Sequence, residues 1–123
     1  MKLRILVIEP VTPELLAPVV VEDLRRGLGA GAVLDHVAID DGPTSVETSE
    51  QERLAVPGVL GAVTRAQRAG YHAAVIGCVA DVGVLEARAQ TSMPVIGPGE
   101  AALRLAQLWH GRVAILIATD SGK

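Results

Sequence analysis

Cys78, the only cysteine of the 123-residue chain, is the side chain whose type and position most clearly suit chemistry. It ends an apolar run typical of a β-strand, residues 71–78, and a helical pattern begins a few residues later. A thiol at the point where a strand gives way to a helix lies at the edge of a parallel sheet that commonly carries the chemistry of α/β proteins. The competing interpretation is a small buried apolar side chain, which is how most free cysteines behave.

Further polar residues follow the other predicted strands and are expected at the same edge as Cys78. Helix N-termini at this edge carry free N–H groups that favour a small carboxylate. The same field is expected to lower the pKa of the thiol and to make a thiolate available as a base. The polar residues are Glu9, Thr12, Thr44, Ser45, Glu47, Asp81, Glu100, Thr119 and Asp120.

Several of these polar residues also have a structural interpretation. Thr44 and Ser45 are common in turns, where their hydroxyls bond to nearby backbone groups. Asp81 can equally cap the helix after the third strand, and Thr12 can cap the helix that follows it. Glu100 suits the first turn of a helix because of the helix dipole. The sequence alone leaves these alternatives open.

The elements that position these residues alternate along the whole chain. Aliphatic and β-branched runs predict strands at 3–8, 32–39, 73–77, 94–96 and 112–118, whereas helical patterns occupy 13–28, 57–69, 84–91 and 100–109. Phenylalanine is absent, so the core must consist of Val, Leu, Ile and Ala, which suits parallel strands buried on both faces. The alternation predicts one α/β domain with a parallel sheet of four or five strands and right-handed crossovers.

Composition argues against several functional classes. A net charge of −3, with half of the residues hydrophobic and a fifth charged, is typical of an ordinary globular protein. The basic residues are scattered and no aromatic residues lie between them, so no nucleic-acid partner is expected. No apolar run approaches the length of a membrane span and no secretory leader precedes Leu3. The expected location is therefore the cytoplasm, without a membrane partner.

The sequence also gives no sign of a metal or nucleotide site. One cysteine excludes an intrachain disulfide and a thiol-rich zinc site. His36, His72 and His110 lack the spacing of metal ligands and are interpreted as surface or strand-end residues. The loop Gly97–Gly99 is too short for a dinucleotide or phosphate-binding signature. No cofactor is expected.

Four separated segments together resemble a known family. They are Gly42–Glu47, Glu52–Pro57, Ala74–Cys78 and Val95–Ala102, in that order. They look like the aspartate/glutamate/hydantoin racemase family, and most like its hydantoin racemase branch. The resemblance covers nearly the whole chain but only the first half of the family's usual length. It implies that residues 1–123 form a single domain corresponding to the N-terminal lobe, a flavodoxin-like three-layer α/β sandwich.

The resemblance implies a cofactor-independent racemase-type isomerase with its site between two pseudo-symmetric lobes. In such a mechanism one cysteine removes the proton α to a carbonyl or carboxylate, and a second cysteine on the opposite lobe returns a proton to the other face. Cys78 matches the first of these cysteines. The substrate, a small carboxylate or a hydantoin, would be held by backbone N–H groups beside the cysteine and by hydroxyls near strand ends. The implied substrate-binding residues are Thr12, Thr44, Ser45, Val79, Asp81 and Thr119.

Two departures from the family pattern shape the hypotheses. The sequence ends at Lys123 without a second cysteine, and it has Glu9-Pro-Val-Thr12 where the hydantoin branch resembles Asn-Pro-Asn-Thr. The carboxylate of Glu9 is expected to repel an anionic substrate. One hypothesis is a homo-oligomer in which two copies each supply Cys78. The other is a catalytically incomplete half-racemase, a binding or remnant domain with an inert thiol.

The apolar closing stretch, residues 112–118, bears on this choice. It must be buried either by joining the sheet of its own lobe or by pairing with another chain. A homo-oligomer is therefore expected.

Overall fold

A four-stranded parallel sheet lies at the centre of the computed structural model, which describes residues 1–15 and 18–116. The strands stand in the order β2-β1-β3-β4, and every pairing is parallel. Their bounds are β1 Leu3–Glu9, β2 Ala32–Ala38, β3 Ala73–Ile76 and β4 Val95–Ile96. This order is flavodoxin-like, and its topological switch point lies between β1 and β3. The predicted parallel sheet is confirmed with four strands.

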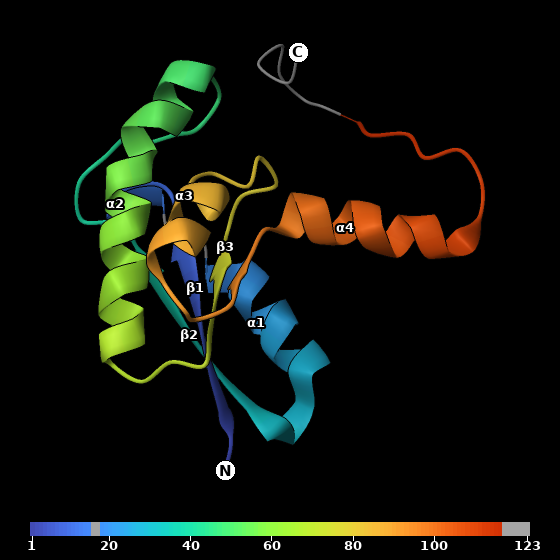
Figure 1. Cartoon of the computed structure of the whole chain (residues 1–123), viewed down its shortest axis with the longest axis horizontal. Coiled ribbons are helices and arrows are strands. Elements are labelled where there is room, and N and C mark those ends of the chain that lie inside the picture. The colour runs from blue at the N-terminus through green and yellow to red at the C-terminus, as the bar shows by residue number, and fades with distance from the viewer. Residues whose placement is uncertain (16–17, 117–123) are drawn as a thin grey trace.

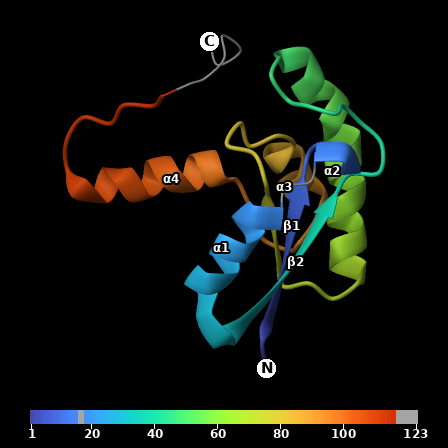
Figure 2. The ribbon, with the colours of Figure 1, turned by 180° about the vertical axis from the view of Figure 1, so that it is seen from behind.

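Helices cover both faces of the sheet, so the predicted three layers are confirmed. Helix α1 (Pro18–Leu28) lies on one face, and α2 (Ser49–Arg68) and α3 (Val84–Gln90) lie on the other (Figure 1). In the view from behind, α1 lies on one side of β1 and β2 and α2 on the other (Figure 2). Helix α4 (Pro98–Ala106) extends away from the sheet. Short 3-10 helices occupy Pro13–Leu15, Gly29–Gly31 and Gln107–Trp109.

Strand periodicity divides the core between the two faces. On the face of α2 and α3, Leu6 and Ile8 pack with a buried stripe of α2 that recurs at helical spacing. On the face of α1, Val7 packs with Val21 and Leu34. The buried stripe of α2 consists of Ala55, Val59, Ala62, Val63 and Ala66.

Helix α2 begins well before its predicted start at residue 57. Its first turn is closed by a capping box: the Thr48 hydroxyl accepts from the Gln51 N–H at 3.2 Å, and the Gln51 side chain accepts from the Thr48 N–H at 3.0 Å. Pro57, which suggested a helix start, lies inside the helix. The local signal Thr-x-x-Gln therefore outweighs the proline, whose cost is one lost hydrogen bond in a helix held by tertiary packing.

The end of the described chain differs from prediction as well. Residues 112–116 form no strand, and residues 117–118 of the predicted fifth strand lie outside the described residues. Helix α4 carries the chain away from β4, so this apolar segment has no strand beside it to complete its hydrogen bonds (Figure 1). Ile115 and Leu116 are consequently exposed.

The first predicted helix, 13–28, is also divided. A 3-10 helix occupies Pro13–Leu15, and α1 begins at Pro18. Residues 16–17 lie outside the described residues.

Candidate functional site at the carboxyl edge of the sheet

The loops after β1, β2 and β3 meet at one edge of the sheet, as predicted. The Thr12 N–H donates to the Pro43 carbonyl at 3.0 Å, which joins the first two loops. The Gly77 N–H donates to the Ile8 carbonyl at 2.8 Å, directly before Cys78. The thiol therefore lies beside the switch point between β1 and β3.

Cys78 is half-buried against the core on the α2 and α3 face. Burial is the main cause that raises the pKa of its thiol, and the carboxylates of Glu52, Glu9 and Asp81 raise the pKa further. The backbone N–H of Ala80 acts on the sulfur in the opposite direction. The expectation that helix N-termini lower this pKa is wrong, because burial and negative charge outweigh the backbone dipoles.

Asp81 explains why the N-terminus of α4 does not favour a thiolate. Its carboxylate accepts from the N–H of Gly99 at 2.8 Å and from the N–H of Glu100 at 2.7 Å. These are donors of the first turn of α4, so the cap belongs to α4 and not to the helix after the third strand. The positive end of α4 is therefore already occupied by an anion of the chain itself.

Gly97 leaves space for the Asp81 carboxylate at the start of α4. Gly97, the N-cap position of α4, has no side chain with which to cap the helix. A Cβ atom at Gly97 would lie 2.5 Å from the Asp81 carboxyl carbon, so a larger residue would push the carboxylate away. Asp81 itself has φ of 54°, a left-handed conformation that costs energy for a non-glycine residue.

Glu9 and His36 form a close pair on the other face of the sheet, which sequence reasoning missed. His36 Nε2 lies 2.9 Å from Glu9 Oε1, and the two side chains are only 8% and 18% exposed. A Cβ atom at Gly77 would collide with the Glu9 carboxylate, so the glycine leaves room for it. The alternation of β2 places His36 on the same sheet face as buried Leu34, and this was the available signal.

Thr12 lies where the loops after β1 and β2 meet, and its hydroxyl is buried there. Its Oγ1 is buried and makes no hydrogen bond of acceptable geometry. The helix-capping interpretation of Thr12 therefore lacks the bond that it requires. The hydroxyl is near enough to exposed Glu14 to lower the pKa of that carboxyl. A buried hydroxyl without a partner is the kind of group that a ligand can satisfy.

The remaining predicted site residues have different environments. The half-buried Ser45 hydroxyl accepts from the Gln51 side-chain amide at 3.3 Å, which ties the loop to α2. Thr44 is exposed. The Val79 side chain is 80% exposed beside the thiol. Thr119 lies outside the described residues.

Two further contributors to the site were not chosen from the sequence. Glu52 affects the thiol from the first turn of α2, and the predicted start of that helix at residue 57 hid this relation. Ala80 contributes only through its backbone N–H, which no side-chain pattern reveals.

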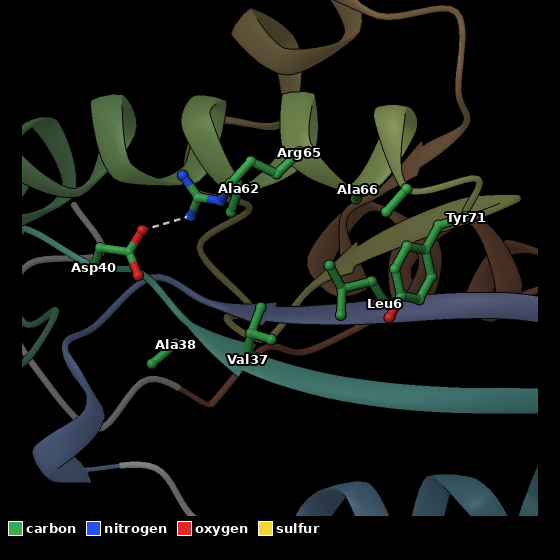
Figure 3. Close-up of a pocket in the computed structure, with 9 residues that line it drawn as sticks. Leu6, Val37, Ala38, Asp40, Ala62, Arg65, Ala66 and Tyr71 are labelled. Atoms are coloured by element: carbon green, nitrogen blue, oxygen red, sulfur yellow. Dashed lines mark ion pairs between the residues drawn. The ribbon is translucent and has the colours of Figure 1, made fainter.

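Two cavities lie away from the thiol. Figure 3 shows the one of about 240 Å³, between α2 and strands β1 and β2, with the 2.8 Å Asp40–Arg65 ion pair at one end and Tyr71 at the other. A cavity of about 480 Å³ adjoins it beneath the loop after β2 and also reaches Asp40 and Arg65. Neither cavity is lined by Cys78. The thiol lies instead at the carboxyl edge of the sheet, half-buried against the core.

Two classes of feature were also sought over residues 1–15 and 18–116. There, three or more His, Cys, Asp or Glu side chains nowhere come together in a way that could hold a metal ion. Of the helices in this part of the chain, none combines the length and the apolar character that crossing a membrane requires.

The fold and site define a flavodoxin-like α/β lobe with a thiol at its carboxyl edge. The family model for Asp/Glu/hydantoin racemases matches residues 5–122, and the chain belongs to that family. This confirms the resemblance found in the sequence.

Individual relatives are hydantoin and allantoin racemases. A hydantoin racemase of Pseudomonas sp. (strain NS671) is 35% identical over 75 residues, which cover 61% of this chain and 30% of that protein. One of Rhizobium meliloti is 30% identical over 109 residues, covering 86% and 45%. The solved structure of an allantoin racemase from Klebsiella pneumoniae matches with a TM-score of 0.81 and 31% identity, over 87% of this chain and 44% of that one. The chain thus spans less than half the length of these relatives.

Proposed function

We propose that the chain is the first lobe of a racemase-type isomerase and that Cys78 exchanges the proton at a carbon α to a carbonyl. The half-buried thiol at the topological switch point, in a chain of this family, is the observation that carries the proposal. The names of its relatives support the same reaction class. Residues 1–123 would then correspond to one of two lobes.

The raised thiol pKa assigns Cys78 a definite part in this reaction. Burial and the nearby carboxylates raise the pKa of the thiol, which favours its protonated form, the form that delivers a proton to a carbanion. A second base on the opposite face takes the original proton, and the carbanion then receives one from Cys78. The C–H bond broken on one face is replaced by a C–H bond on the other, which inverts the centre. In the reverse direction the Cys78 thiolate is a strong base.

Charge near the thiol favours a neutral substrate. Glu9, Glu52 and Asp81 all raise the thiol pKa, so a substrate carboxylate beside Cys78 would meet three negative charges. A hydantoin ring has no carboxylate, and its N–H groups can donate to acidic side chains. We therefore propose a 5-substituted hydantoin or a related cyclic ureide, in preference to aspartate or glutamate. The predicted contacts from Thr12, Ser45 and the Val79 N–H remain part of this proposal.

Residues 1–123 hold one cysteine, so the second base lies outside them. We propose that a second copy supplies it, with the two Cys78 side chains facing across a shared cleft, one as the thiol that delivers a proton and the other as the thiolate that removes one. The apolar surface of α4 and the segment after it supports an oligomer, because its large apolar side chains are exposed in the single chain. They are Leu103, Leu105, Leu108, Trp109, Val113, Ile115 and Leu116.

A free thiol that must cycle through its thiolate requires a compartment that keeps cysteines reduced, such as the cytoplasm.

One observation favours a second candidate, a catalytically incomplete binding lobe. A buried thiol with a raised pKa is also what an inert structural cysteine shows. Such a lobe would retain the carboxyl-edge site, including the unpartnered Thr12 hydroxyl, without turning over a substrate. The two candidates differ in whether Cys78 exchanges protons.

Exchange of the α-proton with D₂O, followed by NMR, tests the proposal. The full chain is incubated with a 5-substituted hydantoin, with allantoin, and with aspartate and glutamate. We expect exchange of the hydantoin-type compounds by the wild type, its loss in Cys78→Ala, and little exchange of the amino acids. Absence of exchange in the wild type, or equal exchange in Cys78→Ala, would reject the isomerase in favour of the binding lobe. The matched control is Ser92→Ala, an exposed hydroxyl away from the thiol.

A further inference from the structure

We propose that Asp81 is a positioning residue for the Cys78 thiol, which it holds in place by clipping the turn after β3 to the first turn of α4. This inference rests on the proposed function of Cys78. The clip consists of the two hydrogen bonds that the Asp81 carboxylate accepts from the N–H groups of Gly99 and Glu100. It assigns Asp81 a role distinct from contact with substrate.

The clip acts on the thiol because the turn between them is short and closed. The Asp81 N–H donates to the Cys78 carbonyl at 3.0 Å, so residues 78–81 form one turn. The Ala80 N–H, inside that turn, is the group that lowers the thiol pKa. Whatever fixes the far end of the turn at Asp81 therefore also fixes the direction of this N–H relative to the sulfur.

Close packing from α4 reinforces the same turn. The Val79 carbonyl lies so near Gly99 that a Cβ atom on this glycine would collide with it. The Asp81 carboxylate would also lie 3.1 Å from that Cβ atom, closer than an ordinary van der Waals contact. Gly99 thus allows the backbone of the thiol turn and the helix terminus to approach each other closely.

The clip matters to α4 as well, because this helix has few other attachments. No residue of α4 is buried among those that the structure describes. Its N-terminal turn is held by the clip and by the 2.9 Å ion pair between Arg88 and Glu100. A movement of α4 is therefore transmitted to the Cys78 turn through Asp81. A partner chain that packs on α4 would hold the Cys78 turn in place in the same way.

Two substitutions at Asp81 separate the effect of its hydrogen bonds to α4 from the effect of its negative charge. Both Asp81→Asn and Asp81→Ala remove a negative charge that raises the thiol pKa. The asparagine oxygen can still accept from one of the two N–H groups, whereas alanine cannot. Because asparagine tolerates the left-handed φ of 54° better than alanine does, Asp81→Gly is included as well: glycine adopts this φ freely and has no oxygen to accept from α4. The difference between Asp81→Asn and Asp81→Gly therefore reports the clip. Gly99→Ala is the second test, since it retains every charge and displaces the Val79 carbonyl.

The first measurement is amide hydrogen exchange of the ¹⁵N-labelled full chain. In Asp81→Ala we expect the amides of Gly99, Glu100 and Ala80 to exchange about tenfold faster, the factor for one lost hydrogen bond of ordinary strength. Ala80 should also exchange faster in Gly99→Ala. Glu86→Gln is the matched control, because it removes an exposed carboxylate from α3 and leaves the clip and the Arg88–Glu100 ion pair in place. If Ala80 keeps its wild-type rate in both variants while Gly99 and Glu100 accelerate in Asp81→Ala, Asp81 is only a helix cap and the proposal is overturned.

The second measurement is the pH profile of Cys78 alkylation by iodoacetamide. At neutral pH we expect Cys78 in Asp81→Asn to be alkylated faster than in the wild type, because a carboxylate that raises the thiol pKa is removed. Cys78 in Asp81→Ala and in Asp81→Gly should be alkylated about threefold to tenfold more slowly than in Asp81→Asn, because the Ala80 N–H that lowers the thiol pKa is no longer held in place. Equal profiles for Asp81→Asn and Asp81→Gly would overturn the proposal. Neither measurement needs a substrate. A chain that passes them yet shows no proton exchange would retain the clip and lose the racemase function.

Discussion

Replacing Glu9 tests whether its pairing with His36 acts as a buried hydrogen bond at the edge of the site. The two atoms are 2.9 Å apart and both side chains are largely buried, so the pair is shielded from water. In Glu9→Gln the amide oxygen can still accept from His36 Nε2. In Glu9→Ala that nitrogen loses its partner, and the Cγ methylene and the carboxylate over Gly77 are lost as well.

The structure sets the size of the effect. An unsatisfied buried nitrogen costs about 1–3 kcal/mol, and each fully buried methylene contributes about 0.8 kcal/mol. Because Glu9 is partly exposed, we expect Glu9→Ala to lower the free energy of unfolding by about 2–4 kcal/mol. For a chain of this length the melting temperature should fall by about 10 °C. Glu9→Gln should cost about 1 kcal/mol or less.

Urea denaturation and thermal unfolding of the two variants give these quantities, and alkylation of Cys78 gives a second readout. Because the Glu9 carboxylate raises the thiol pKa, both variants should have a lower thiol pKa than the wild type, even though only one is strongly destabilised. A Glu9→Gln variant as unstable as Glu9→Ala would refute the hydrogen-bond reasoning. It would show that the charge itself is required.

Three further outcomes are expected. Thr48→Ala should lower the free energy of unfolding in urea by about 1 kcal/mol, because the capping box with Gln51 is lost. Alkylation of wild-type Cys78 should remain slow at neutral pH and rise only above the ordinary pKa of cysteine, because burial and nearby carboxylates raise the thiol pKa. Tyr71→Phe should lose about 1 kcal/mol with its 2.6 Å hydrogen bond to Asp35. The Asp35 partner raises the Tyr71 pKa, so this contribution is full below the pKa of the unfolded chain and disappears as pH rises through the folded pKa.

Each of these outcomes has a result that would contradict it. Thr48→Ser keeps the capping hydroxyl and should be close to wild type; equal losses for Ser and Ala would argue against the cap. Rapid alkylation of Cys78 at neutral pH would contradict the raised thiol pKa. A Tyr71→Phe loss that stays constant at high pH would contradict the phenol hydrogen bond, since phenylalanine keeps the ring beneath the Arg4 guanidinium, 4.3 Å from its centroid.

Much of the fold was predictable because its signals are local. Strand β1 was expected at residues 3–8 and occupies Leu3–Glu9, and β3 was expected at 73–77 and occupies Ala73–Ile76. Buried parallel strands require continuous apolar runs, which are visible in the sequence. The start of α2 has an equally local signal in Thr48 and Gln51, but the start predicted at residue 57 rested on Pro57 and did not include this capping box.

The fifth strand shows where local signals fail. Residues 112–116 have the composition of a strand, but a strand exists only beside a partner. The direction of α4 takes them away from β4, and composition does not encode that direction.

The sequence by itself determined the alternation of strands and helices, the placement of Cys78 at the carboxyl edge and the family resemblance, because each depends on neighbouring residues or on motif order. Only the tertiary structure decided the direction of the thiol pKa shift and the role of Asp81. The Asp81 clip joins residues 18 and 19 positions apart, and the Glu9–His36 pair joins residues 27 apart. Such contacts depend on sheet register and on loop direction. The thiol pKa depends in turn on the burial and charges that these contacts bring to Cys78.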